Sequence, residues 1–160
     1  YYALTEYELK KILVIDLDVH QGNGTASIMK NESRVFTFSM HGAKNYPFKK
    51  EISDIDVELE DGIEDDQYLY LLEKNLKQIN QLFEPQIIFY ISGVDILSTD
   101  KLGRLKITRE GCKERDDLVF DYAFKNNLPI ITSMGGGYST KTYDIVEAHC
   151  NTFKSMLRLI

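Results

Sequence analysis

Two acidic residues and a histidine alternate in the sequence at the end of a very apolar run. Asp16, Asp18 and His20 belong to the segment that begins KILVID at residue 11. If the strand continues through them, all three side chains project to the same side, because strand side chains alternate. Acids that follow a buried strand repel and desolvate each other unless a cation or hydrogen-bond donors compensate them. This spacing favours a metal site over a solvated strand end.

A third ligand for such an ion follows another apolar run. Asp95 comes shortly after residues 86–92 and directly after Gly93-Val94, where the glycine permits an unusual backbone turn. In open α/β sheets the carboxyl ends of the strands lie at one edge, where ligands bind. Asp18, His20 and Asp95 then form a site with three protein ligands and open positions, as catalytic zinc sites do.

Three glycines and a tyrosine follow a further apolar run, at residues 129–134. Gly135, Gly136 and Gly137 let the backbone approach a ligand, and Tyr138 then enters the same edge of the sheet. The plain alternative is a flexible turn with an ordinary aromatic residue. Because a phenolic O–H can stabilise a developing oxyanion opposite a metal, Tyr138 is the candidate electrophilic residue.

The elements that must position these residues follow the pattern of βα units in a parallel sheet. Four runs dense in β-branched and aromatic residues predict strands covered on both faces, at residues 11–16, 34–40, 86–92 and 129–134. Ile55–Leu59 alternates apolar and acidic residues like an exposed edge strand. Helical spacing predicts helices over residues 65–83, 108–125, from about Thr140 to the C-terminus and, shorter, over 22–29. The sequence predicts one α/β domain.

The composition is that of an ordinary globular domain. The 160 residues are 43% hydrophobic and 28% charged, with a net charge of −6. Without clustered Lys and Arg we expect no direct nucleic-acid binding, while a cationic ligand is tolerated. Cys112 and Cys150 lack CxxC spacing and are expected to be free thiols. No membrane span or signal sequence is apparent, so we expect an intracellular protein, cytoplasmic or, in a eukaryote, nuclear.

Taken together, these segments resemble the histone deacetylase family from Lys11 to the C-terminus. Residues 15–25 (IDLDVHQGNGT) are similar to the family's metal segment, residues 93–95 (GVD) to its second metal segment, and residues 135–138 (GGGY) to its catalytic tyrosine loop. The sequence HQGNG, together with residues 57–66 and 100–105, is most similar to the class IV branch and its bacterial relatives.

The resemblance implies an arginase/deacetylase fold, in which a mostly parallel sheet is the middle of three αβα layers. It implies a hydrolase that removes acetyl or longer acyl groups from lysine in a protein or peptide. In that scheme Asp18, His20 and Asp95 bind zinc or ferrous iron, and Tyr138 stabilises the tetrahedral oxyanion. The residues expected to contact the substrate are Tyr46, Leu102, Gly136 and Gly137.

The resemblance also implies two further roles near the metal. Asp16 and Ser39 are expected to hold a structural potassium ion. Asp16 and Asn23 are expected to orient the family's general base and acid. That base and acid are a pair of adjacent histidines upstream of the first metal segment. The chain has only His20, His41 and His149. We therefore expect residues 1–160 to be the C-terminal portion of one catalytic domain, inactive by itself.

Four other interpretations agree with part of the sequence. A haloacid dehalogenase-type phosphotransferase also ends its first strand in Asp-x-Asp, but it needs a small hydroxyl or apolar residue at the position of His20. A binuclear arginase-type enzyme needs a further aspartate where Gly22 stands. A non-catalytic fragment that binds metal or a partner remains open. So does a deacetylase of small acetylated amines such as polyamines.

Overall fold

Five strands form one sheet in which every neighbouring pair is parallel, in the order β3-β2-β1-β4-β5. The computed structural model describes residues 1–158. The strands are β1 (Ile12–Asp16), β2 (Val35–Gly42), β3 (Ile55–Leu59), β4 (Ile87–Gly93) and β5 (Ile130–Gly135). Each coincides with a predicted strand to within two residues, and β3 lies at an edge as predicted. The parallel α/β fold is confirmed.

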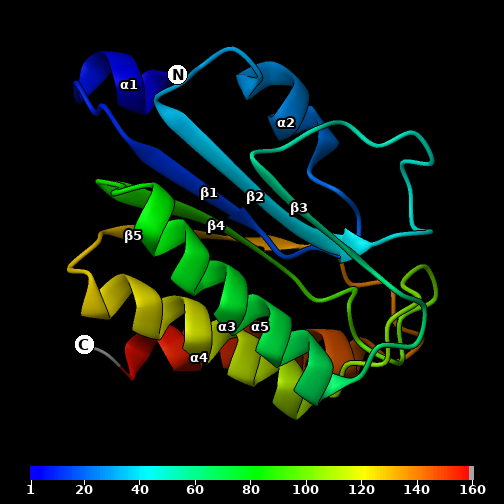
Figure 1. The fold of residues 1–160 in the computed structure, drawn as a ribbon. Helices are drawn as coiled ribbons and strands as arrows, with labels where there is room; N and C mark the ends of the chain where they lie inside the picture. The colour runs from blue at the N-terminus through cyan, green and yellow to red at the C-terminus, as the bar shows by residue number, and fades with distance from the viewer. Residues whose placement is uncertain (159–160) are drawn as a thin grey trace.

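Helices cover both faces of this sheet, which gives the three expected layers (Figure 1). They are α1 (Tyr2–Glu6), α2 (Asn23–Met29), α3 (Asp65–Leu82), α4 (Arg109–Lys125) and α5 (Thr142–Leu157). The five-residue α1 was not predicted, because so short a helix shows no helical periodicity. The predicted extension of the last helix through residues 159–160 lies outside the described residues. Within residues 1–158, the helices are too short or too polar to cross a membrane.

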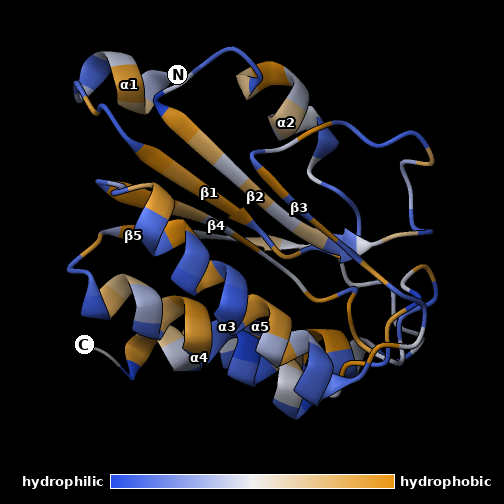
Figure 2. Ribbon diagram, viewed as in Figure 1, coloured by the Kyte–Doolittle hydropathy of each residue, from blue (hydrophilic) through white to orange (hydrophobic). Residues whose placement is uncertain are grey.

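The two faces of the sheet are buried to very different extents. Helices α3, α4 and α5 cover one face, where side chains such as Leu13, Phe38 and Tyr90 belong to the large core cluster. On the opposite face, α1 and α2 lie by β1 and β2, and the fully buried cluster has only three members, Leu4, Ile12 and Val35. Along α3 polar and apolar segments alternate (Figure 2), and its apolar residues Leu72, Leu76 and Ile79 are buried.

Strand β5 contradicts the prediction that all four apolar strands are covered on both faces. It is the other edge of the sheet, and Ile131 and Met134 are exposed. An apolar run shows that a strand can be covered but not which segments cover it. The order of the strands nevertheless places the ends of β1, β4 and β5 side by side, so the three chemically interesting loops leave the sheet at adjacent positions.

The two cysteines lie in helices and are free. Cys112 is buried in α4, and Cys150 is exposed on α5. Burial raises the pKa of the Cys112 thiol to about 11, so this side chain behaves as a small apolar group. Neither cysteine contributes to the cluster described next.

Candidate metal centre

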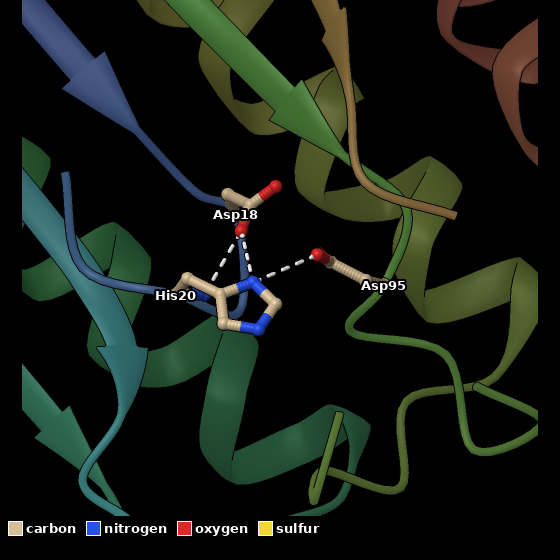
Figure 3. A group of neighbouring side chains, drawn as sticks. All are labelled: Asp18, His20 and Asp95. Carbon is tan, nitrogen blue, oxygen red and sulfur yellow. Dashed lines mark hydrogen bonds and ion pairs between the residues drawn. The ribbon is translucent and has the colours of Figure 1, made fainter. Parts of the chain in front are cut away.

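Asp18, His20 and Asp95 converge at the carboxyl edge of the sheet, as predicted. One potential ligand atom from each lies within 4.8 Å of the others. His20 Nδ1 is 2.9 Å from Asp18 Oδ1 and 3.2 Å from Asp95 Oδ2, and the imidazole lies between the two carboxylates (Figure 3). The Asp95 side chain is fully buried, whereas His20 is a quarter exposed. The cluster can therefore hold an ion and still be reached from one side.

The loop after β1 brings Asp18 and His20 together by two successive turns. The Asp18 N–H donates to Asp16 Oδ1 at 3.1 Å, and the His20 N–H donates to Asp18 Oδ1 at 2.9 Å. Aspartates commonly accept a hydrogen bond from the N–H two residues on. Since β1 ends at Asp16, the expectation that strand alternation aligns all three side chains was wrong. Asp16 is the start of the turn and is not part of the three-residue cluster.

Asp95 reaches the cluster from the loop after β4. Its Oδ1 accepts the Val19 N–H at 3.0 Å, which ties the two loops together. Gly93 has no positive φ, so its predicted role in an unusual turn was wrong. A Cβ on Gly93 would instead lie 2.6 Å from Asp18 Cα. Glycine is needed here because the two loops approach too closely for any side chain.

The electrostatics of the cluster follow from burial and shared hydrogen bonds. Burial raises the pKa of Asp95. Burial opposes ionisation of Asp18 as well, but the hydrogen bonds from His20 outweigh it and lower the Asp18 pKa. Hydrogen bonding to Asp18 and then to Asp95 raises the pKa of His20 to about 10. A single ring nitrogen with one proton thus faces two carboxylates, an arrangement that a cation bound to all three groups would satisfy better.

The glycine loop after β5 lies directly against this cluster. Gly136 has a φ of 57°, and a Cβ there would collide with the Asp95 carboxylate. The loop continues to Tyr138, whose N–H donates to Asp100 Oδ2 at 2.6 Å. The Tyr138 side chain is 47% exposed. At Gly136 the backbone therefore lies close to Asp95, a candidate metal ligand, while the approach of these glycines to a bound ligand stays a prediction.

The residues expected to contact the substrate come from loops that are joined by hydrogen bonds between side chains and backbone groups. The buried Asn45 side chain donates to the Leu102 carbonyl oxygen at 2.7 Å, which links the segment of Tyr46 to that of Leu102. Asp100 Oδ1 accepts the Leu102 N–H at 2.8 Å and so connects this segment to Tyr138. Asp100 was not identified from the sequence as a site residue, although it begins the segment 100–105 that resembles the family.

The two predicted potassium ligands lie on neighbouring strands. Asp16 and Ser39 are register partners on β1 and β2. Ser39 Oγ accepts the Gly22 N–H at 3.3 Å and lies 2.9 Å from His41 Nδ1. Burial raises the pKa of Asp16 to about 7. Asn23 is the first residue of α2 and is half-buried.

Comparison with known proteins agrees with this geometry. Residues 1–153 match the family model described as the histone deacetylase domain, so the chain belongs to the histone deacetylase family. It is 33% identical over 149 residues to histone deacetylase 2 of Arabidopsis thaliana, an alignment that covers 91% of this chain and 38% of that protein. An uncharacterized protein of Picosynechococcus is 41% identical over 140 residues, with 88% and 47% covered.

The fold is also that of a solved enzyme structure. Acetylpolyamine aminohydrolase from Burkholderia pseudomallei superposes with a TM-score of 0.83 at 18% identity, covering 96% of this chain and 47% of that one. At this identity the likeness concerns the fold alone. The chain spans less than half the length of each of these three proteins.

Proposed function

We propose that this chain forms the metal-binding part of a deacylase that hydrolyses the amide bond of acetyl-lysine or longer acyl-lysine in proteins or peptides. The observation that carries the proposal is the convergence of Asp18, His20 and Asp95 within 4.8 Å, in a chain of the histone deacetylase family. The similarity of residues 57–66 and 100–105 to the class IV branch supports placing it in that branch.

The donor set supports zinc or ferrous iron. Two carboxylates and one imidazole are ligands that both ions accept, and three protein ligands leave a position open for chemistry. Asp95 Oδ2 is buried, and it shares the nearby His20 Nδ1, 3.2 Å away, with Asp18 Oδ1, which lies closer at 2.9 Å. Two carboxylate oxygens that share one donor fit a cation. Bound there, the ion would polarise the substrate carbonyl and lower the pKa of a water molecule.

Tyr138 is proposed to donate its phenolic O–H to the carbonyl oxygen as negative charge develops on it. The contact of Gly136 with Asp95 and the Tyr138–Asp100 hydrogen bond keep this loop beside the metal ligands. The half-exposed side chain is free to meet a substrate. Gly136 and Gly137 are proposed to contact the substrate through their backbone, because a side chain at either position would collide with Asp95 or with Ile145.

Tyr46 and Leu102 are proposed to line the path of the acyl-lysine side chain. Both are exposed apolar or aromatic side chains, and the Asn45–Leu102 hydrogen bond ties their segments together. Asp16 and Ser39 are proposed to hold potassium, because a buried carboxylate beside a hydroxyl suits a cation with oxygen ligands. A monovalent ion there would offset the burial of Asp16.

Proton transfer requires groups in addition to those described. His41 pairs with Ser39, and burial lowers the pKa of His41. His149, which belongs to α5, packs against Gly137. We place residues 1–160 as the C-terminal portion of one catalytic domain whose remainder supplies the adjacent histidines, oriented by Asp16 and Asn23. The exposed face of β5 is the proposed site where that remainder packs. By itself the chain would then bind metal without turnover.

A second candidate substrate is a small acylated amine. The structural neighbour from Burkholderia pseudomallei is an acetylpolyamine aminohydrolase by name, and its fold agrees with this chain over 96% of the residues. The net charge of −6 is compatible with either cationic product. Acyl-lysine peptides and acetylated polyamines are therefore the two substrate classes to compare.

The test is an assay of the complete protein with acyl-lysine peptides of graded chain length and with acetylated polyamines. We expect hydrolysis that stops on chelation and returns with Zn²⁺ or Fe²⁺. Tight stoichiometric metal binding without turnover of any substrate would favour the non-catalytic alternative. Failure to bind either metal would refute the proposed centre itself.

A further inference from the structure

A buried ion pair lies in the middle of α4, directly beneath the candidate metal centre. Arg115 and Asp116 are both fully buried, with Arg115 Nη2 2.8 Å from Asp116 Oδ1. They occupy the inward stripe of the helix, between Cys112 and Val119. Charged residues are rarely fully buried unless they are paired, so the contacts of this pair indicate why it is there.

The Arg115 guanidinium reaches the two loops that carry the metal ligands. Arg115 Nη1 donates to the carbonyl oxygen of Leu17 at 3.3 Å and also to that of Gly93. Leu17 directly precedes Asp18, and Gly93 lies two residues before Asp95. One planar group thus bridges the exits of β1 and β4, at the backbone positions that aim both aspartates.

The Asp116 carboxylate of the ion pair is also fixed by hydrogen bonds. Asp116 Oδ1 accepts a hydrogen bond from the Tyr90 phenol of β4, and Asp116 Oδ2 accepts one from Thr152 Oγ1 of α5 at 2.7 Å. The Tyr90 ring centroid is 5.9 Å from Arg115 Cζ. Groups from two helices and one strand therefore fix the guanidinium. Its N–H donors stay in place and define where the two loop carbonyl groups bind.

We infer that Arg115, held by Asp116, is a positioning residue that sets the spacing of Asp18 and Asp95 for metal binding. The inference rests on the proposed metal centre. Arginine suits this role because its rigid fork can donate to two carbonyl groups at once, which an ammonium cannot do with the same geometry. A purely stabilising role is a weaker explanation, because buried ion pairs can often be replaced by uncharged residues without loss of stability.

The test measures the dissociation constant of Zn²⁺, by competition with a chelator, in the complete protein. The double variant Arg115→Met/Asp116→Asn removes both buried charges and keeps the side-chain sizes similar. Lys113→Met/Asp117→Asn makes the corresponding changes in a more exposed ion pair of the same helix, whose atoms Nζ and Oδ2 are 2.7 Å apart. Removing groups that orient metal ligands typically weakens binding about 10- to 100-fold. We expect that loss in the Arg115 double variant and none in the control.

Arg115→Lys supplies a second measurement in case the double variant does not fold. A lysine can donate to one of the two carbonyl oxygens, so we expect an intermediate loss of Zn²⁺ affinity in a variant that is still folded at the temperature of the measurement. Wild-type affinity in either folded variant would overturn the inference, as would an equal loss in the Lys113 control. If the wild-type protein itself binds no metal, the proposed function fails first, and the two failures are thereby distinguished.

Discussion

The candidate metal ligands and the residues proposed to meet the substrate lie at the same edge of the sheet but differ in how far the chain encloses them. The Asp95 side chain is fully buried, and those of Asp18 and His20 are 17% and 25% exposed. The residues proposed around the substrate are 47% to 63% exposed, namely Tyr138, Leu102 and Tyr46. Contacts within the chain hold the ligands, whereas the substrate residues are held mainly through their backbones.

This difference implies that metal binding and turnover can be separated. The ligand geometry depends on interactions such as Val19–Asp95 and Arg115 with the loop carbonyl groups. None of these interactions requires the exposed side chains. Changes in the exposed residues should therefore alter catalysis while leaving the ion in place, and changes in the ligands should remove both.

The largest effect is expected for Asp18→Ala. Losing one of three ligands should abolish metal retention. Because the metal would supply several kcal/mol of electrostatic stabilisation to the transition state, the rate should then fall about a thousandfold or more. Metal content after dialysis and kcat/KM measure the two losses. Asp61→Ala, which removes a carboxylate that pairs with Arg104 at the surface, is the control. Unchanged metal content in Asp18→Ala would contradict the assignment.

An intermediate effect is expected for Tyr138→Phe. Removing one donor to a developing oxyanion typically lowers kcat about 100- to 1,000-fold, and the metal should stay bound because Tyr138 belongs to the exposed region. Steady-state kinetics and metal analysis on the same sample check both statements. Tyr143→Phe removes a phenol that is 64% exposed at the start of α5 and should leave kcat unchanged. A Tyr138→Phe enzyme with normal kcat would exclude the proposed donor.

The smallest effect is expected for Leu102→Ala. The backbone carbonyl that accepts from Asn45 is retained, so only an apolar contact with the substrate is lost, on the order of 1 kcal/mol. This predicts a KM for acyl-lysine peptides roughly threefold to tenfold higher, with kcat and metal content unchanged. Leu82→Ala, which is 61% exposed at the end of α3, should leave KM unchanged. An unaltered KM in Leu102→Ala would remove this residue from the substrate path.

Much of the fold could be predicted from the sequence because each element has its own periodicity. The strand β4 and the helix α4 were both located to within one residue. The sequence could not predict which other element each helix or strand packs against, or with which of its faces. Arg115 and Asp116 stand on the apolar stripe of α4, and that position was the available signal for their burial. Their partners could not be found, because Leu17 and Gly93 are 98 and 22 residues away from Arg115.

The sequence by itself determined the five strands, the helices α2 to α5 and the residue types at the strand exits, including the three candidate ligands. Periodicity is local, since it depends on how side chains alternate along a strand or repeat around a helix. Only the tertiary structure decided how the two loops are joined, with Asp95 accepting the Val19 N–H from 76 residues earlier, and that Gly93 must lack a side chain. Such contacts depend on the order β3-β2-β1-β4-β5, which is set by packing between segments distant in the chain.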